Sequence, residues 1–297
     1  MSKPFFSVII PTFNRAEKLR RALDALKSQT CRDFEVIVCD DGSTDATGEV
    51  VSEYAGVLPV TYLWEANWGG PARPRNRGVA AAHGEWICFL DADDWWYPEK
   101  LVEVLHKTGE ADLIYHDCDV YTEDGRSSVG KRSRQLQAPV FVELMTRGCS
   151  LVTSSICVKK ELLDKSGGFA EEQELVAIED YDLWIRIARI SESFLYLPRS
   201  LGAYWVDQAN ISEFSEKYIA RETAVCRRYS GLLSLPDRDE AEILLAYKIG
   251  VAKKYLGAFD ASRIFFRAAM RSNRLKIRLY ALFYYVLALL RSRYTIP

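Results

Sequence analysis

Short apolar runs alternate with helix-like stretches over the first third of the chain. Three apolar runs are short and rich in branched and aromatic side chains, as in strands that are buried on both faces: Phe5–Pro11, Phe34–Cys39 and Glu85–Leu90. Val60–Trp64 is expected to form a further strand. The intervening segments predict helices over Arg15–Gln29, Ala46–Tyr54 and Arg75–Ala82. Strands that alternate with helices predict an α/β protein with a mostly parallel central sheet.

The same alternation continues more loosely to about residue 206, and the pattern is helical after Ser212. The further expected elements are helix Pro98–Lys107, strand Leu113–Tyr121, helix Val140–Thr146, strand Ser154–Val158, helix Glu179–Ile190 and one or two strands within Phe194–Val206. Near the end, Leu275–Leu290 is almost wholly apolar and has basic residues on both sides. It is too short to span a bilayer. It suits a helix lying in a membrane interface, or alternatively a helix buried against the domain or against a second copy of the chain.

Charge divides the chain into two parts. Residues 1–214 carry 23 Lys and Arg against 34 Asp and Glu, a net −11, whereas residues 215–297 carry 16 against 7, a net +9. We therefore predict two domains with these boundaries and an anionic partner for the second. The charges flanking the apolar helix favour an anionic membrane over nucleic acid, which we do not expect as a partner.

The cysteines show no spacing typical of a zinc site. Cys39, Cys88 and Cys157 lie in apolar runs, which predicts small core residues and fits a reducing cytoplasm. The first apolar run is short and ends at a proline, so we expect no signal peptide. The expected location is cytoplasmic, peripheral at the inner face of the cytoplasmic membrane.

The run Glu85–Trp95 carries the most distinctive chemistry. Its first half is a strand-like apolar run, and three carboxylates follow within four residues: Asp91, Asp93 and Asp94. Like charges so close together repel unless a cation compensates them, and carboxylate oxygens suit Mg²⁺ or Mn²⁺. The alternative is a solvated acidic turn that begins the helix at Pro98.

Other polar clusters follow the predicted strands or begin helices: Pro11–Asn14, Asp40–Ser43, Arg75-Asn76 and Glu179-Asp180. Each alone is explained as a cap or a turn. Ligands bind beyond the carboxyl ends of strands in open α/β sheets. The clusters together therefore predict one binding site at that edge.

Over about residues 4–212 the sequence resembles the family 2 glycosyltransferases with the GT-A fold. The resemblance rests on SVIIPTFNR, VIVCDDGSTD, PRNRGVAAAHGEWICFLDADDW and IEDYDLWIR, in this order and spacing. It implies a GT-A domain over 1–214, followed by a C-terminal α-helical extension over 215–297.

The resemblance also implies roles for individual residues. Asp180 matches the general base of inverting members. Asp91-Ala92-Asp93 matches the DXD motif, with Asp93 as the metal ligand and Asp91 and Asp207 as further candidates. The residues that would bind the nucleotide or donor sugar are Pro11, Thr12, Asn14, Asp40, Asp41, Arg75, Asn76, Asp91, Ala92 and Asp94. Glu179 and Trp184 are candidates for acceptor contacts.

The sequence departs from the family pattern in two places. Family members often carry a histidine where this chain has Asp207, which leaves that contribution to the metal site open. Arg73-Pro74 replaces small residues before Arg75, and Pro74 is compatible with a helix start.

The expected function is metal-dependent, inverting transfer of a hexose from a nucleotide sugar, with a UDP-sugar favoured, to a glycan hydroxyl. The metal would be Mn²⁺ or Mg²⁺. The acceptor would be lipid-linked, in bacterial surface polysaccharide, lipopolysaccharide or glycoprotein synthesis. Two alternatives stay open: a non-catalytic nucleotide-binding or membrane scaffold protein, and a sugar-phosphate nucleotidyltransferase.

Overall fold

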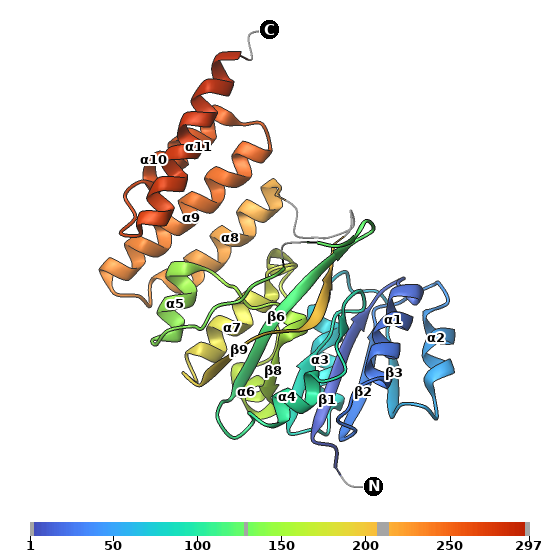
Figure 1. Ribbon diagram of the computed structural model, residues 1–297. Coiled ribbons are helices and arrows are strands. Elements are labelled where there is room, and N and C mark those ends of the chain that lie inside the picture. Colours follow the sequence, from blue (N-terminus) through green and yellow to red (C-terminus); the bar gives the residue numbers. More distant parts are fainter. Residues whose placement is uncertain (1–2, 128–129, 207–213, 295–297) are drawn as a thin grey trace. The chain divides into compact units, whose positions relative to one another are not determined.

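The computed structural model describes residues 3–127, 130–206 and 214–294 (Figure 1). The chain divides into two compact units. The first comprises Met1–Val140, Ser150–Glu171 and Glu179–Asn210, and the second comprises Phe141–Cys149, Glu172–Ile178 and Ile211–Pro297. The predicted α/β class with a helical C-terminal region is confirmed. The separate roles predicted for residues 1–214 and 215–297 stay predictions.

One mixed sheet forms the centre of the first unit. Within the described residues its strands are β1 (Phe6–Thr12), β2 (Phe34–Asp40), β3 (Val60–Trp64), β4 (Trp86–Phe89), β5 (Trp95–Trp96), β6 (Leu113–Thr122), β7 (Gly125–Arg126), β8 (Cys157–Lys159) and β9 (Phe194–Trp205). Their order is β3-β2-β1-β4-β8-β6-β9-β5, and β7 pairs with β6. The strands β3, β2, β1 and β4 run parallel, as do β6 and β9, whereas β5, β7 and β8 pair antiparallel.

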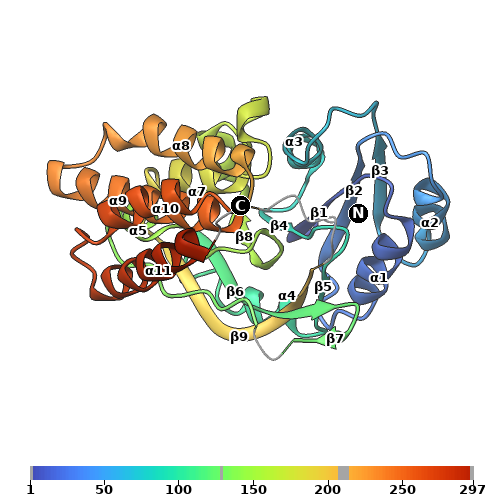
Figure 2. The same ribbon diagram turned by 90° about the horizontal axis from the view of Figure 1, so that it is seen from above.

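Helices cover both faces of the parallel strands (Figure 2). The helices of this unit are α1 (Ala16–Lys27), α2 (Thr47–Tyr54), α3 (Ala72–Ala81), α4 (Lys100–Leu105), α6 (Lys160–Ser166) and α7 (Glu179–Ala188). Alternate residues Phe6, Val8 and Ile10 of β1 share one core with the buried side chains of α1 and α2. Ile9 faces α3, where a Cβ added at Gly78 would lie 2.6 Å from Ile9 Cγ2. The lack of a side chain at Gly78 therefore lets α3 lie close against the sheet.

Parallel pairing brings separate polar clusters to one edge of the sheet. Thr12 is in register with Asp40, and Ile9 with Phe89, so the segments after β1, β2 and β4 emerge side by side. Two local expectations were wrong. Helix α3 begins at Ala72, before Arg75, and the predicted strand over Ser154–Val158 begins as a turn of 3₁₀ helix, η1 (Thr153–Ser155). The short strands β5 and β7 were not predicted.

The buried cysteines on β4 and β8 are neighbours across the sheet. Cys88 and Cys157 are in register in the antiparallel pair, and the structure joins them by a disulfide with a Cα–Cα distance of 4.2 Å. Both are buried, as predicted. The bond itself was not predicted, because the two residues are 69 positions apart and only the pairing of their strands brings them together.

The second unit is helical. It contains most of α5 (Val140–Arg147), the 3₁₀ turn η2 (Gln173–Leu175), α8 (Glu216–Ser230), α9 (Leu235–Tyr255), α10 (Phe259–Ala269) and α11 (Leu275–Tyr294). Its core joins α9, α10 and α11 through Leu244, Phe266, Ile277 and Ala281. A Cβ at Gly250 would lie 2.8 Å from the Phe266 ring, so this glycine lets α9 and α10 pack closely. Within the described residues, no helix is both long and apolar enough to cross a membrane.

Candidate active site

The loop after β4 carries the three predicted carboxylates, and each has a different environment. Asp94 is buried, and it accepts hydrogen bonds from the Ser154 hydroxyl and, at 2.8 Å, from the backbone N–H of Trp205. Asp93 forms an ion pair with Arg15. The Asp91 side chain is about a third exposed, and one of its oxygens lies 2.6 Å from Arg75 Nη2. The acidic run is thus a structured loop, not a solvated turn.

Arg75 links this loop to the start of α7. Its side chain is buried, and its Nη1 donates to Glu179 Oε1 at 2.7 Å while its Nη2 donates to Asp91 Oδ1. Burial alone would lower the pKa of Arg75. The negative charges of Asp91 and Glu179 raise this pKa by more than burial lowers it, so the net shift is upward. Arg75 therefore stays charged and holds two acidic segments together.

Burial and mutual repulsion raise the pKa values of several carboxyls here. Burial raises the pKa of Asp93, and the charge of Asp91 adds to it, against the opposing effect of Arg15. The pKa of Asp94 is raised well above its usual range by burial and then by Asp93 and Asp91. Burial likewise raises the pKa of Glu179. The cluster thus holds negative charge that a cation would stabilise.

Asp180 lies on α7 beside Glu179 and remains partly exposed. Its Oδ2 accepts a hydrogen bond of 2.8 Å from the Thr153 hydroxyl, and its Oδ1 accepts one of 2.6 Å from the Tyr181 N–H. Desolvation raises the pKa of Asp180, while the Thr153 hydrogen bond and the charge of Arg75 oppose that rise. An accessible carboxylate with a raised pKa is chemically suited to accept a proton near neutral pH.

The segments after β1 and β2 form the other side of the edge. Asp40 is fully buried and accepts from Ser43 N–H at 2.8 Å and from the Tyr62 hydroxyl. Asp41 accepts from Trp68 N–H at 2.9 Å and Gly69 N–H at 3.1 Å. These carboxylates thus hold turns in place. Pro11 and Thr12 are buried at the end of β1, and the Thr12 hydroxyl has no hydrogen-bond partner within the described chain.

Asn14 lies two residues before α1 but does not cap it. Its φ is +50°, and its side-chain oxygen accepts from the Thr44 N–H at 2.8 Å. The Ala16 N–H at the start of α1 is instead bound by Asp45 Oδ2 at 3.1 Å. Asn14 therefore ties the loop after β1 to the turn after β2.

Three predicted site residues lie in other settings. The side-chain amide of Asn76 binds the backbone of Phe169, at 2.9 Å for Nδ2 to the carbonyl and 2.8 Å for Oδ1 to the N–H, so it fixes that loop. Trp184 is fully buried and packs with Phe89 and Phe169, which is a core position. Asp207 lies outside the described residues.

Several residues that complete the loop were not predicted as site residues. Arg21 contacts two indole rings, with its guanidinium carbon 4.1 Å from the Trp95 centroid and 4.6 Å from the Trp205 centroid, and it donates to the Asp93 carbonyl at 2.6 Å. Arg15, Thr153 and Ser154 contact Asp93, Asp180 and Asp94 respectively. Arg15 stands in the quoted PTFNR motif, which was the available signal for it, whereas the others look like ordinary helix, loop and strand residues.

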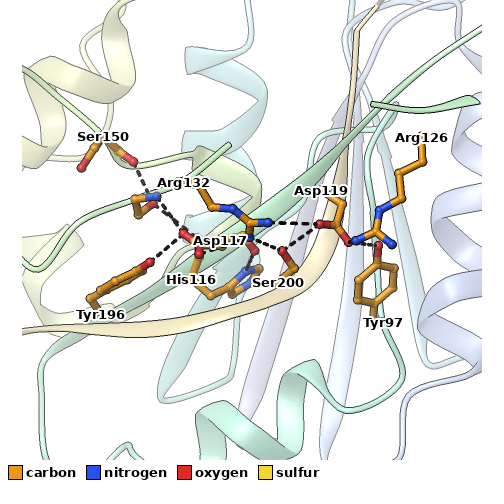
Figure 3. Close-up of polar contacts among 10 residues, drawn as sticks. Tyr97, His116, Asp117, Asp119, Arg126, Arg132, Ser150, Tyr196 and Ser200 are labelled. Carbon is orange, nitrogen blue, oxygen red and sulfur yellow. Dashed lines mark hydrogen bonds and ion pairs between the residues drawn. The ribbon is translucent and has the colours of Figure 1, made fainter. Parts of the chain in front are cut away.

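A second polar cluster lies along β6 and β9 (Figure 3). Asp117 and Asp119 on β6 are buried. Their side-chain partners are Tyr97, Arg126, Arg132, Tyr196 and Ser200. Burial would raise the pKa of Asp119, but hydrogen bonds from Tyr97, Arg126 and Ser200 lower it more. Through these contacts the cluster holds Arg126 of β7 and Arg132, which follows β7, against the sheet.

The donor set of the β4 loop fits a hard divalent cation only in part. Asp91 and Asp93 supply carboxylate oxygens, the ligand type that Mg²⁺ and Mn²⁺ prefer. Among the residues that the structure describes, no group of three or more His, Cys, Asp or Glu side chains could hold a metal alone. Mg²⁺ commonly binds through one or two carboxylates together with substrate phosphates and water. The two aspartates fit that mode.

We predict that Arg75→Gln destabilises the first unit by about 3–5 kcal/mol, because it leaves Glu179 buried without its charged partner. The measurement is urea unfolding. The matched control is Arg73→Gln on the same helix, because the Arg73–Glu65 ion pair is exposed and 3.2 Å long. Its loss should cost less than about 1 kcal/mol. Equal, small effects of the two substitutions would contradict the central role of Arg75.

Comparison with known proteins identifies the family. The model described as "Glycosyl transferase family 2" matches residues 7–157. The amylovoran biosynthesis glycosyltransferase AmsB of Erwinia amylovora is 32% identical over 211 residues, which is 67% of this chain and 69% of AmsB.

Solved structures share the fold. TarS of S. aureus, in a structure of residues 1–349 in complex with UDP-GlcNAc, matches with a TM-score of 0.63 and 18% identity over 95% of this chain and 88% of that one. In a longer TarS structure the match spans only 53% of that chain. The mannosyltransferase PcManGT from Pyrobaculum calidifontis, in complex with GDP-Man and Mn²⁺, matches with a TM-score of 0.62 and 20% identity over 97% of this chain and 81% of that one.

These likenesses confirm the predicted GT-A-like fold. The family model and the similarity to AmsB show that this chain belongs to glycosyl transferase family 2.

Proposed function

We propose that the chain transfers a hexose from a nucleotide sugar to a hydroxyl of a glycan acceptor, with inversion at the anomeric carbon. One observation carries this proposal: Arg75 joins the Asp91–Asp94 loop to the helix start that bears Asp180. Donor-binding carboxylates and a candidate base thus lie at one edge of one sheet. A UDP-sugar is the favoured donor, which the TarS complex with UDP-GlcNAc supports and the PcManGT complex with GDP-Man leaves open.

The chain's residues have distinct roles in the proposed reaction. Thr12, Asp40 and Asp41 line the nucleotide side, and Asp94 lies toward the donor sugar. Asp180 accepts the proton of the acceptor hydroxyl as its oxygen attacks the anomeric carbon. The bond from that carbon to the diphosphate breaks, and the nucleoside diphosphate leaves with the electron pair. No nucleophilic carboxylate is needed, because a single displacement inverts the configuration.

A divalent ion belongs to the proposal. Asp93 and Asp91 would hold Mn²⁺ or Mg²⁺, and the Mn²⁺ in the PcManGT complex supports this. When bound, such an ion neutralises the charge of the leaving diphosphate. Arg15 pairs with Asp93 in this structure, so the ion and Arg15 compete for the same carboxylate. Asp207 remains a further candidate ligand.

The proposed acceptor is a lipid-linked glycan in bacterial surface polysaccharide, lipopolysaccharide or glycoprotein synthesis. The helical unit supports membrane contact through α11. Leu275, Leu279, Leu282, Phe283, Val286 and Leu290 follow helical spacing and are each at least 45% exposed. The buried residues Ile277, Ala281 and Ala288 occupy other positions of the same helix. Exposed Arg271, Lys276, Arg278 and Arg291 accompany the apolar stripe, as in interfacial helices on anionic lipid.

From this arrangement we propose that the protein is a peripheral enzyme at the inner face of the cytoplasmic membrane. The alternative is a homodimer, in which the apolar stripes of two copies would pack against each other. The basic residues favour the membrane, because like charges would oppose each other across a symmetric dimer.

We predict that one of UDP, GDP, CDP and dTDP stabilises the protein and that Mn²⁺ enlarges the effect. A ligand at about 100 times its Kd adds about 2.7 kcal/mol, and each kcal/mol raises the melting temperature by roughly 2–4 °C. The measurement is a thermal-shift screen of each nucleotide with and without Mn²⁺.

The matched variants are Asp93→Ala and Asp124→Ala, an exposed residue of the β6–β7 turn. Asp93→Ala should lose the part of the shift that depends on Mn²⁺, and Asp124→Ala should keep all of it. No shift with any nucleotide would favour the scaffold function instead.

We predict that the triple variant Leu279→Ser, Phe283→Ser, Val286→Ser loses binding to vesicles of phosphatidylglycerol and phosphatidylcholine, because it removes apolar area from the exposed stripe. The measurement is flotation with these vesicles and with vesicles of phosphatidylcholine alone, which should bind more weakly.

The control is the double variant Leu232→Ser, Leu235→Ser, whose side chains are 54% and 72% exposed outside α11. It should bind as the wild type does. If the triple variant floats as well as the wild type, or if it only converts a dimer into a monomer, the membrane proposal fails.

A further inference from the structure

The 3₁₀ turn η1 lies between the two acidic parts of the candidate active site. Its residues Thr153, Ser154 and Ser155 are 5%, 2% and 0% exposed. Two backbone hydrogen bonds close the turn, from Ser155 N–H to the Val152 carbonyl at 2.8 Å and from Ile156 N–H to the Thr153 carbonyl at 3.1 Å. The turn runs directly into β8 in the middle of the sheet. The turn is therefore buried and closed by its own backbone hydrogen bonds.

One side of the turn holds the Asp91–Asp94 loop. The Ser154 hydroxyl accepts from the Asp91 N–H at 3.0 Å and donates to Asp94 Oδ2. The Ser154 carbonyl accepts from Trp96 Nε1 at 2.7 Å. These contacts before and after the loop fix where its carboxylates lie.

Thr153, the residue before Ser154, contacts the Asp180 carboxylate. The Thr153 hydroxyl donates to Asp180 Oδ2 at 2.8 Å, across 27 positions of sequence. Threonine is β-branched and has a restricted χ1 angle, so its hydroxyl is held in a defined direction. The other oxygen, Oδ1, accepts from the N–H of Tyr181 in the same helix. Among the residues that the structure describes, the Thr153 hydroxyl is thus the only hydrogen-bond donor to the Asp180 carboxylate from outside α7.

The groups that face Asp180 do not replace this contact. Arg75 from α3 and Asp91 from the β4 loop act on it through charge, with opposite signs. Glu179 from its own helix and Tyr204 from β9 are also within its electrostatic reach. For the described residues, no hydrogen bond from these four groups to the Asp180 carboxylate is present. The Thr153 hydrogen bond favours the ionised carboxylate, which is the form that accepts a proton.

We propose that Thr153 is a positioning residue for Asp180, and that η1 sets the distance between the proton-accepting carboxylate and the donor-binding loop through the adjacent side chains Thr153 and Ser154. This inference rests on the proposed function and adds a residue to it. Thr153 does not touch the reacting atoms. It orients the carboxylate and keeps it ionised.

The test is the pH profile of nucleotide-sugar turnover by Thr153→Val, which removes the hydroxyl and keeps the shape. The probes are UDP-GlcNAc, UDP-glucose, UDP-galactose and GDP-mannose, each with Mn²⁺. Loss of a hydrogen bond to a charged group should lower kcat at pH 7 about tenfold and move the acidic limb of the profile up by about one pH unit. The KM for the donor should stay within about twofold of the wild-type value.

Two variants separate positioning from simple support of the fold. Thr153→Ser keeps a hydroxyl and should restore the wild-type pH profile. Ser155→Ala removes the hydroxyl that donates to the Val152 carbonyl at 2.7 Å in the same turn, and it should leave the profile unchanged. A wild-type profile for Thr153→Val, or an equal shift for Ser155→Ala, would overturn the proposal.

The test remains decisive if Thr153→Val folds poorly. The pair Thr153→Ser and Thr153→Ala then carries the comparison, and only alanine should shift the profile. If the wild type turns over none of the probes, the proposed function fails, and ¹³C NMR titration of the Asp180 carboxyl still tests the inference. The pKa of that carboxyl should rise in Thr153→Val, and an unchanged pKa would contradict the role of Thr153.

Discussion

The candidate site depends on a buried arginine held between two carboxylates. Arg75 contacts Asp91 at 2.6 Å and Glu179 at 2.7 Å, and Glu179 is 104 positions away from Arg75 in the sequence. An unpaired charge in this position would be strongly destabilising, so the three residues are stable there only together. Because Glu179 begins α7, the same contact sets where Asp180 lies. Gly78 contributes by letting α3, which carries Arg75, lie against β1.

The sheet determines which residues can take part. Parallel pairing of β1, β2 and β4 places their carboxyl ends along one edge, and β8 then runs antiparallel between β4 and β6. That reversal brings η1, at the start of β8, beside the end of β4. It explains how Ser154 contacts Asp94 while its neighbour Thr153 contacts Asp180.

Much of the fold followed from local patterns, and much of the site did not. The buried strands and their helices were predictable because their apolar runs are pronounced, as in β1 and β2. The family resemblance indicated the Asp91–Asp94 loop and Glu179-Asp180. Arg21, Thr153 and the Cys88–Cys157 disulfide had no sequence signal, because each depends on pairing between distant segments. The helical unit also recruits Phe141–Cys149 from the middle of the chain, which charge counting along the sequence cannot reveal.

The stereochemistry of the product tests the account most directly. With an α-linked nucleotide sugar that the enzyme turns over, ¹H NMR would follow which anomer of the transferred or released sugar appears first, before mutarotation. A single displacement with Asp180 as the base predicts the β anomer, and predicts that Asp180→Asn forms neither anomer while still binding the nucleotide. Initial formation of the α anomer, or an active Asp180→Asn enzyme, would contradict it.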